Sequence, residues 1–394
     1  MIAVIADDFT GAAELGGIGL RHRLAVEIST VVNTSTKAGL LVIATDTRSM
    51  QREAAVAEME KITRQLSLLQ PEWIYKKVDS VLRGYVIPEI KAQLKALGGK
   101  RALLIPANPA LGRTIIDGHY FLNGQPVHQS SFSIDPEFPV TSSDLQDMLH
   151  TRQEPVPVRK VSDPLPDTGI IVGEVKDLAD LSAWAGLIDK TTFLAGASGF
   201  FSALLSARTY TDPSILVRHR PPGSPALFVS GSTFDKSREA IWEKKSQGGP
   251  VSYMPATLAM AQQEEGALYD SWCEEVVDLL RNHSKAIVAI REEFGSQEDH
   301  PDEKVAVPGT RSARWLKVHT AQLVRRVLQQ VSIEELAIEG GATAYAILEQ
   351  AGFRTFFPEQ ELAPGVIRMK VKEAPSLYLT VKPGSYNWPE SLQY

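Results

Sequence analysis

Residues 2–20 read IAVIADDFTGAAELGGIGL, and this stretch decides the fold class. Its opening run, IAVIA (2–6), is apolar throughout, which is typical of a strand that is buried on both faces. Asp7 and Asp8 follow the run, and a helical pattern begins near Thr10. A buried strand that leads directly into a helix is the repeating unit of a parallel α/β sheet.

The same alternation of apolar runs and helical patterns continues along the chain. Further strands are predicted at LLVIAT (40–45), WIYKKV (73–78), RALLIPA (101–107), GIIVGEV (169–175), TTFLAGA (191–197), ALFVSGS (226–232), KAIVAI (285–290), the start of ELAIEGGATAYAILEQAG (335–352) and LYLTVKPGS (377–385). The dipeptide Asn123-Gly124 within YFLNGQPV (120–127) is a hairpin signal. The sequence therefore predicts an α/β protein with mainly parallel sheets flanked by helices, and a hairpin added to its first half.

A change in composition predicts where two domains divide. The stretch RTYTDPSILVRHRPPGSP (208–225) is rich in proline and charge, and a new strand follows it. A chain of 394 residues is long enough for two domains. We expect a first domain at 1–210, a linker at 211–224 and a second domain at 225–394.

Composition excludes several classes of protein. Cys273 is the only cysteine, so an internal disulfide and a cysteine-zinc cluster are both impossible. The net charge is −6 and no basic stripe is present, which gives a nucleic-acid partner no electrostatic support. The longest uncharged run, between Lys190 and Arg208, is too short for a membrane span and reads as a strand followed by a core helix. With no signal peptide at its start, the chain is expected to be soluble and cytoplasmic, with no membrane partner.

Polar clusters follow the predicted strands of the first half, where ligands of α/β sheets bind. Adjacent carboxylates at Asp7 and Asp8 can hold a hydroxylated ligand or hydrated magnesium, or accept a hydroxyl proton. The alternative is that they cap the helix that follows. In KKVDSVLRG (76–84), Arg83 can bind a carboxylate with two parallel hydrogen bonds. The alternative is a solvated loop with Ser80 as a helix cap.

A third cluster of the first half is NPALGR (108–113), with Asp117 after it. From the pattern alone, Arg113 is either a binding residue or a plain surface arginine. The sequence carries neither the HExxH spacing of a zinc enzyme nor the GxSxG elbow of an α/β-hydrolase.

The second half carries glycine-rich turns near predicted strand ends, at SGS (230–232), EGGAT (339–343), APG (363–365) and KPGS (382–385). Glycines let backbone N–H groups approach an anion, and a helix that starts near Thr343 points its positive end at a phosphate. Neither a GxxxxGK[ST] loop nor a GxGxxG motif is present. Taken singly each turn is only a turn, but the four together suggest phosphate binding.

These segments resemble the four-carbon acid sugar kinase family. The matching segments are IADDFTGA (5–12), KKVDSVLRG (76–84), IPANPALGRTIIDGHYFLNG (105–124), FVSGS (228–232), GGATA (340–344), APGV (363–366) and VKPGS (381–385). They occur in the family's order and cover nearly the whole chain. The resemblance implies an N-terminal domain that binds a sugar acid, a C-terminal domain that binds ATP, and phosphorylation of threonate, erythronate or their keto analogues with magnesium ATP.

With this resemblance, we expect the sugar acid to be bound by Asp7, Thr10, Lys76, Lys77, Ser80, Arg83 and Arg113. Asp8 and Asp79 are the expected catalytic residues, as acceptors of the hydroxyl proton. The expected nucleotide-binding residues are Ser230, Gly231, Ser232, Gly340, Gly341, Ala342, Thr343, Gly365, Lys382 and Gly384. No residue is assigned to bind a metal directly, and a homo-oligomer is left open.

Three positions depart from the family pattern. Ala342 stands where the family has an acid, KPGSYNWPE (382–390) replaces a glycine-rich stretch, and Glu14 stands where many members have Asp. The missing acid leaves open an altered metal dependence, a different phosphoryl donor or a weakened enzyme. The competing hypotheses are therefore a non-catalytic sugar-acid or nucleotide sensor, and a kinase for another hydroxy-acid.

Overall fold

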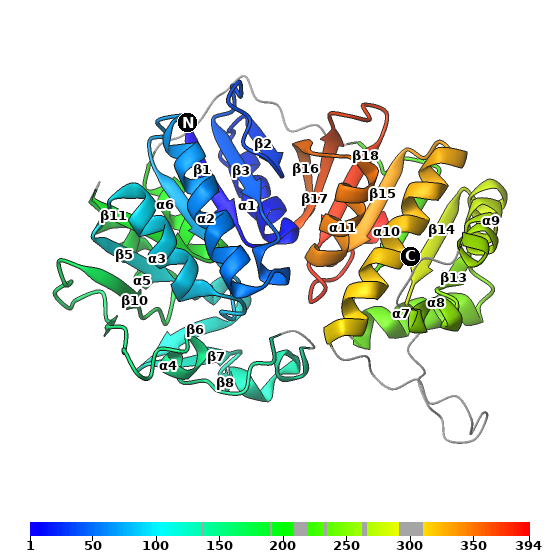
Figure 1. The fold of residues 1–394 in the computed structure, drawn as a ribbon. Helices are drawn as coiled ribbons and strands as arrows, with labels where there is room; N and C mark the ends of the chain where they lie inside the picture. The colour runs from blue at the N-terminus through cyan, green and yellow to red at the C-terminus, as the bar shows by residue number, and fades with distance from the viewer. Residues whose placement is uncertain (136–137, 190, 209–219, 232–234, 262–265, 291–309) are drawn as a thin grey trace. The chain divides into compact units, whose positions relative to one another are not determined.

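The structure is a computed structural model that describes residues 1–394 except 136–137, 190, 209–219, 232–234, 262–265 and 291–309 (Figure 1). It divides into two compact units. Unit 1 is Met1–Arg218 with Thr355–Pro364, and unit 2 is His219–Arg354 with Gly365–Tyr394. Thr355–Pro364 thus belongs to the first unit, although the expected division placed it in the second domain. Ser232 and most of the predicted linker, 211–219, lie outside the described residues.

Unit 1 is built on a sheet with the strand order β16-β2-β3-β1-β4-β11-β5-β10-β9. Neighbouring strands run parallel, except that β16 is antiparallel to β2. The strands are β1 (Ile2–Ala6), β2 (Val26–Ser29), β3 (Leu40–Ala44), β4 (Ile74–Lys77), β5 (Arg101–Ile105), β9 (Val158–Arg159), β10 (Gly169–Gly173), β11 (Thr192–Gly196) and β16 (Thr355–Ala363). The apolar runs predicted as strands in this half are strands, and the mainly parallel α/β prediction is confirmed.

Helices cover both faces of this sheet. On one face α2 (Arg52–Ser67) packs beside α3 (Val86–Leu97), while on the other face α6 (Ser198–Ser206) packs against α1 (Phe9–Arg21) and α5 (Leu178–Gly186). The short helix α4 (Leu145–Met148) lies outside these layers. This two-sided cover explains why the central strands are apolar throughout.

The predicted hairpin forms a separate small sheet. Its strands are β6 (Arg113–Ile116), β7 (His119–Leu122) and β8 (Gln125–Pro126), in the order β6-β7-β8. The turn between β7 and β8 is Asn123-Gly124, with φ of 51° and 78°. Both residues are left-handed, as the favoured two-residue hairpin turn requires.

Unit 2 has the strand order β13-β14-β12-β15-β18-β17, parallel except for β17 against β18. Its strands are β12 (Ala226–Ser230), β13 (Val251–Tyr253), β14 (Lys285–Ala289), β15 (Glu335–Glu339), β17 (Val366–Val371) and β18 (Tyr378–Lys382). Helix α10 (Thr310–Gln330) packs against α8 (Ala256–Met260), α9 (Gly266–His283) and α11 (Gly341–Ala351). Helix α7 (Asp235–Ser246) follows β12, and residues 383–394, here called the C-terminal segment, follow β18.

None of the helices in the described ranges is long and apolar enough to cross a membrane. The uncharged run before Arg208 contains β11 and the buried helix α6, as the sequence predicted.

Candidate functional site

The ends of three neighbouring strands of unit 1 bring the predicted acids together. Asp7 and Asp8 follow β1, Asp79 lies just beyond β4, and Arg48 lies in the short 3-10 helix Thr47–Ser49 after β3. Arg48 Nη2 is 2.9 Å from Asp7 Oδ2 and 3.4 Å from Asp8 Oδ1, and Arg48 Nη1 is 3.6 Å from Asp79 Oδ1. The Arg48 side chain is 14% exposed, so one largely buried guanidinium lies within 4 Å of three carboxylates.

Asp8 is both a helix cap and a member of this cluster. Its Oδ1 accepts a hydrogen bond from the Gly11 backbone N–H at 2.9 Å, and its Oδ2 accepts one from the Thr10 hydroxyl at 2.6 Å. Burial alone would raise the pKa of Asp8, but the charges of Arg48 and Lys77 outweigh it and hold that pKa below its ordinary value. The capping alternative is therefore real, and it leaves an ionised carboxylate at the strand edge.

Asp79 and Arg83 form a two-pronged pair. Arg83 Nε donates to Asp79 Oδ2 at 2.9 Å and Nη2 donates to Oδ1 at 2.8 Å, while Nη1 donates to Asp135 at 2.6 Å. Burial would raise the pKa of Asp79, but Arg83 and then Arg48 bring it well below its ordinary value. Asp79 therefore holds Arg83 in place and is a weak base.

The two adjacent lysines point to opposite faces of β4, as alternation along a strand requires. Lys76 is fully buried, with its Nζ 2.7 Å from the Glu89 carboxylate of α3, so it is out of reach of a ligand. Burial argues against the expectation that Lys76 binds the sugar acid, and that role stays a prediction. Lys77 lies on the side of α1, where its Nζ donates to the Val78 carbonyl at 2.9 Å and lies 3.8 Å from Glu14.

Arg113 and the Ser80 loop complete this edge of unit 1. The guanidinium of Arg113 lies 5.9 Å from the ring centroid of Phe132, and that of Arg83 lies 5.3 Å from the same ring. Arg113 is buried, and its Nε has no hydrogen-bond partner among the residues that the structure describes. Arg113 is thus not a plain surface arginine. The Ser80 carbonyl accepts a hydrogen bond from the buried Tyr120 hydroxyl.

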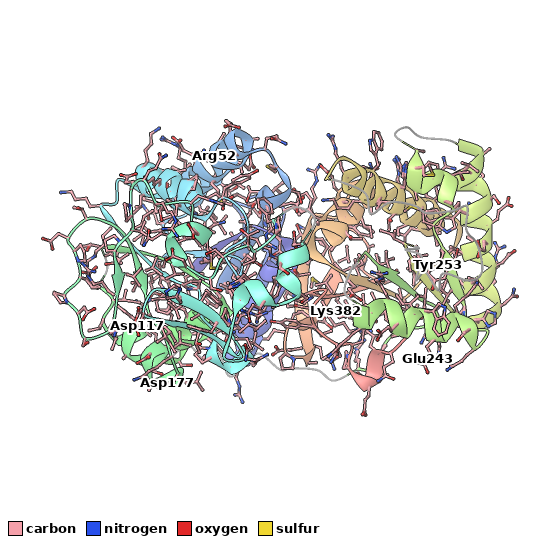
Figure 2. The ribbon with its side chains drawn as sticks, turned by 90° about the horizontal axis from the view of Figure 1, so that it is seen from below. Arg52, Asp117, Asp177, Glu243, Tyr253 and Lys382 are labelled. Carbon is pink, nitrogen blue, oxygen red and sulfur yellow. The ribbon has the colours of Figure 1, made fainter. Side chains whose placement is uncertain are left out.

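Asp117, which follows the Arg113 cluster in sequence, is not part of the site. It lies in the exposed turn between β6 and β7, at the periphery of unit 1 (Figure 2), and pairs with Lys160 at 3.0 Å.

In unit 2 the glycine turns also meet at one sheet edge. Ser230, Glu339 and Lys382 are paired in register at the last positions of β12, β15 and β18. A Cβ on Gly231 would lie 2.0 Å from the Thr343 hydroxyl, so only glycine allows β12 to end this close to α11. Gly340 has φ of 99° and precedes α11 without a side-chain cap.

Among the described residues, Gly340 thus supplies no side-chain cap to the N–H groups of the first turn of α11. This turn contains Gly341, Ala342 and Thr343. Such a helix start can bind a phosphate. Gly365 and Gly384 lie in the turns before β17 and after β18, and since these two strands are antiparallel, both turns lie at this same edge.

Glu339 is the centre of a buried polar network at this edge, and Lys382 is one of its partners. Lys382 Nζ is 2.9 Å from Glu339 Oε2, which also accepts a hydrogen bond from the Tyr394 hydroxyl at 2.6 Å. The Ser237 hydroxyl of α7 donates to Glu339 Oε1 at 2.5 Å. Burial lowers the pKa of Lys382, and Glu339 opposes this shift. Among the described residues no group of three or more His, Cys, Asp or Glu side chains is arranged to hold a metal ion.

Sequence reasoning missed several members of both clusters. Arg48 and Glu339 could have been predicted by the same rule as Asp7, Asp8 and Asp79, because each lies at or just beyond the end of a buried strand. Ser237 and Tyr394 have no such signal, since a helix face and the C-terminal segment bring them to Glu339 from a distance in sequence.

Two family models match the chain in order. The model described as a sugar-binding N-terminal domain matches residues 2–204, and that described as a nucleotide-binding C-terminal domain matches residues 227–386.

Full-length relatives agree with these matches. The chain is 27% identical to a D-threonate kinase of Salmonella typhimurium, over 92% of this chain and 89% of that protein. It is 23% identical to a 3-oxo-tetronate kinase of Actinobacillus succinogenes, over 100% and 98% of the two chains.

Solved structures from Salmonella typhimurium and Haemophilus influenzae share the fold. Their TM-scores are 0.74 and 0.69, at 18% and 19% identity. Each match covers 99% of this chain, and 96% and 98% of the respective solved chains. With both domain models in order and relatives matched along their length, the chain belongs to the four-carbon acid sugar kinase family.

Proposed function

We propose that this protein transfers the γ-phosphoryl group of ATP to a hydroxyl group of a four-carbon sugar acid of the threonate or erythronate type. One observation carries the proposal. The strand ends of unit 1 gather three carboxylates around Arg48, beside Arg83 and Arg113, within the region that the sugar-binding family model matches. Carboxylates accept hydrogen bonds from sugar hydroxyls, and arginines bind a carboxylate, so the cluster offers partners for both kinds of group on a sugar acid.

In this proposal Arg113 is the main anchor of the substrate carboxylate, since its Nε is buried and has no described partner. Arg83 is held by Asp79 and Asp135 and presents its remaining surface beside Arg113, over Phe132. Asp8 accepts the hydroxyl proton as the oxygen attacks phosphorus. The lowered pKa makes Asp8 a weak base, as it does Asp79, but kinases rely on positioning and charge neutralisation more than on a strong base. Asp8 is preferred because Asp79 is held in a two-pronged pair with Arg83.

The nucleotide side of the proposal rests on the second cluster. The α11 N-terminus offers backbone N–H groups to phosphates, Gly231 lets β12 end close to this helix, and Lys382 lies at the same strand edge. Magnesium would enter bound to the phosphates of ATP, with water in most of its remaining positions, as is usual for this ion.

A coupled ADP-release assay tests the function. Purified protein is mixed with Mg-ATP and, in turn, with threonate, erythronate and related hydroxy-acids. We expect turnover with a four-carbon acid, loss of turnover in Asp8→Ala, and an increased KM for the acid alone in Arg113→Ala. Turnover only with longer or differently oxidised acids would show a kinase for another hydroxy-acid. An equal rise in KM for ATP and the acid in Arg113→Ala would contradict the assigned role of Arg113.

One observation favours a second candidate, a non-catalytic sensor of sugar acids or nucleotides. Ala342 occupies the first turn of α11, where family members carry an acid that could orient magnesium or the nucleotide. Calorimetric binding of ATP or an acid without turnover of any acid would support this candidate. An Ala342→Asp variant that then gained turnover would identify this position as the cause.

A further inference from the structure

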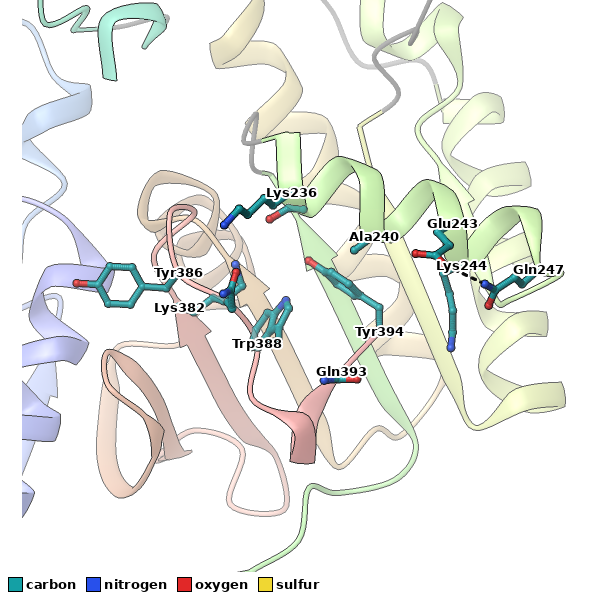
Figure 3. Close-up of a pocket in the computed structure, with 12 residues that line it drawn as sticks. Lys236, Ala240, Glu243, Lys244, Gln247, Lys382, Tyr386, Trp388, Gln393 and Tyr394 are labelled. Atoms are coloured by element: carbon teal, nitrogen blue, oxygen red, sulfur yellow. Dashed lines mark hydrogen bonds between the residues drawn. The ribbon is translucent and has the colours of Figure 1, made fainter. Parts of the chain in front are cut away.

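A pocket of about 430 Å³ lies in unit 2 between α7 and the C-terminal segment (Figure 3). The wall formed by α7 includes Lys236, Ala240 and Lys244, and the facing wall includes Trp388 and Tyr394. The α7 residues that line it run from Lys236 to Lys244, and Gln247 lines it just past the end of the helix. At a helical rise of about 1.5 Å per residue, the α7 wall is roughly 12 Å long, enough for a heterocyclic base and its sugar.

One end of this pocket reaches the strand-edge cluster. Lys382 and Ser237 line the pocket and both contact Glu339, so the pocket is continuous with the network beside the α11 turn. Two further cations, Lys236 and Lys244, line it and are opposed by Glu243. A ligand with a negative charge near these lysines and a flat ring against the facing aromatic wall fits this lining.

The aromatic wall suits a flat ring. The planes of Phe228 and Tyr394 lie at 82° and 79° to that of Trp388, so neither ring stacks on the indole. Lys382 Nζ lies 5.1 Å from the indole centroid and covers part of one face. Trp388 lines the pocket, so a heterocyclic base bound there can contact the indole, and stacking on an aromatic side chain is a strong contribution to base binding.

We propose that this pocket is the base subsite of the nucleotide site, and that it binds the purine ring of ATP by stacking on Trp388, with the phosphates directed toward Lys382 and the α11 turn. The inference rests on the proposed function, since it assumes that ATP is the donor. The glycine turns can bind phosphates but do not recognise the base. In this proposal the base is recognised by the segment at 382–390, which departs from the family pattern.

The first test separates base binding from phosphate binding in the full chain. Ala240→Phe fills the pocket from the exposed side of α7, and Glu239→Phe is its control, because Glu239 is exposed on the same helix and does not line the pocket. Calorimetry measures the Kd for ATP and for inorganic tripolyphosphate, which has no base. We expect Ala240→Phe to raise the Kd for ATP about tenfold or more and to leave the Kd for tripolyphosphate unchanged. The control Glu239→Phe should change neither Kd.

A second readout uses tryptophan fluorescence. ATP should quench the fluorescence of the wild-type protein and of the control Trp242→Phe, since Trp242 is 60% exposed on α7 and does not line the pocket. ATP should not quench the fluorescence of Trp388→Phe. This variant keeps an aromatic ring at the site, so it should keep most of its affinity for ATP. Unchanged ATP affinity in Ala240→Phe, in a protein that turns over ATP, would overturn the base subsite and leave the kinase proposal standing. Wild-type protein that binds no ATP would overturn both.

Discussion

At the scale of single residues, Arg48 is the residue on which the sugar-acid site depends most. Removing one partner of a buried charge cluster leaves the others uncompensated, at a cost of about 3–5 kcal/mol. We expect Arg48→Met to lower the free energy of unfolding by about this amount and to abolish turnover of the sugar acid. Urea denaturation measures the stability. Arg64→Met is the control, because exposed Arg64 forms an ion pair with Glu60 on α2, and the loss of this surface pair should cost about 1 kcal/mol or less.

The acids bound to Arg48 also predict how stability depends on pH. The pKa values of Asp8 and Asp79 are lower in the folded protein than their ordinary value of 3.8. The unfolded chain therefore binds more protons in acid, so this stabilisation is complete above the unfolded pKa and is lost as pH falls toward the folded values. We expect urea midpoints to fall from about pH 5 downward, and to fall less steeply in Arg48→Met. Parallel curves for the two proteins would contradict this account.

Lys76 provides a third prediction, which separates structure from binding. Lys76→Met leaves Glu89 buried without its cation, which should lower the free energy of unfolding by about 3–5 kcal/mol. Because burial already raises the pKa of Glu89, this carboxylate should take up a proton in the variant, and the loss should stay near the lower of these values. The double variant Lys76→Met/Glu89→Leu should recover most of the stability. The KM for the sugar acid should stay unchanged in both, and a large rise in that KM would restore Lys76 as a ligand.

The strand-end rule predicted most of the first site but could not assign every residue in it. It found Asp7, Asp8 and Asp79 because parallel strands end at one edge. It did not distinguish Lys76 from Lys77, because alternation shows that they face opposite sides of β4 but not which side is covered by α3. That depends on the handedness and order of the crossovers, which are properties of the whole sheet.

At the scale of elements, the close approach of β12 to α11 keeps the turn at Gly231 next to the α11 N-terminus, where we propose that phosphates bind. A Cβ on Gly231 would overlap the Thr343 hydroxyl, at 2.0 Å. We expect Gly231→Ala to cost about 1–3 kcal/mol and to raise the Kd for ATP, since α11 must shift from the strand edge. Calorimetry and thermal denaturation measure the two effects. Gly186→Ala is the control, because a Cβ there meets no atom within 4 Å, and a similar loss in this variant would refute the packing explanation.

The elements themselves were largely predictable from local pattern. Long apolar runs such as IAVIA and ALFVS became central strands because burial on both faces requires side chains of this kind. The two-residue strand β9 and the three-residue strand β13 are too short to carry a period. Their pairing is decided by the neighbouring strands, so it could not be read locally.

At the scale of the whole molecule, the chain returns to unit 1 late in its sequence. Strand β16 pairs with β2 through Thr355–Ser29 and Phe356–Ile28. Phe356 is fully buried and meets Phe9 edge to face at 5.1 Å. Sequence analysis placed one boundary near 210 because composition changes there, but a single strand that crosses back leaves no compositional trace. The core of unit 1 is therefore built from two stretches of sequence that are separated by most of unit 2.

This return predicts that the first domain is incomplete without β16. A fragment of residues 1–210 should fold with Phe9 and the edge of β2 uncovered, and losing the contacts of Phe356 should cost about 3–5 kcal/mol. For a domain of this size that lowers Tm by roughly 10 °C relative to the same fragment joined to residues 353–364 by a flexible linker. The joined fragment with Phe356→Ala is the matched control, since it keeps the backbone of the strand and lacks the buried ring. If all three fragments melted at the same temperature, β16 would contribute nothing to the core of unit 1, and the sugar-acid site would need only the contiguous first domain. If only the joined fragment with Phe356 is stabilised, the site at the end of β1 depends on a strand encoded in the second half of the chain, and truncation of that half will weaken sugar-acid binding even where ATP plays no part.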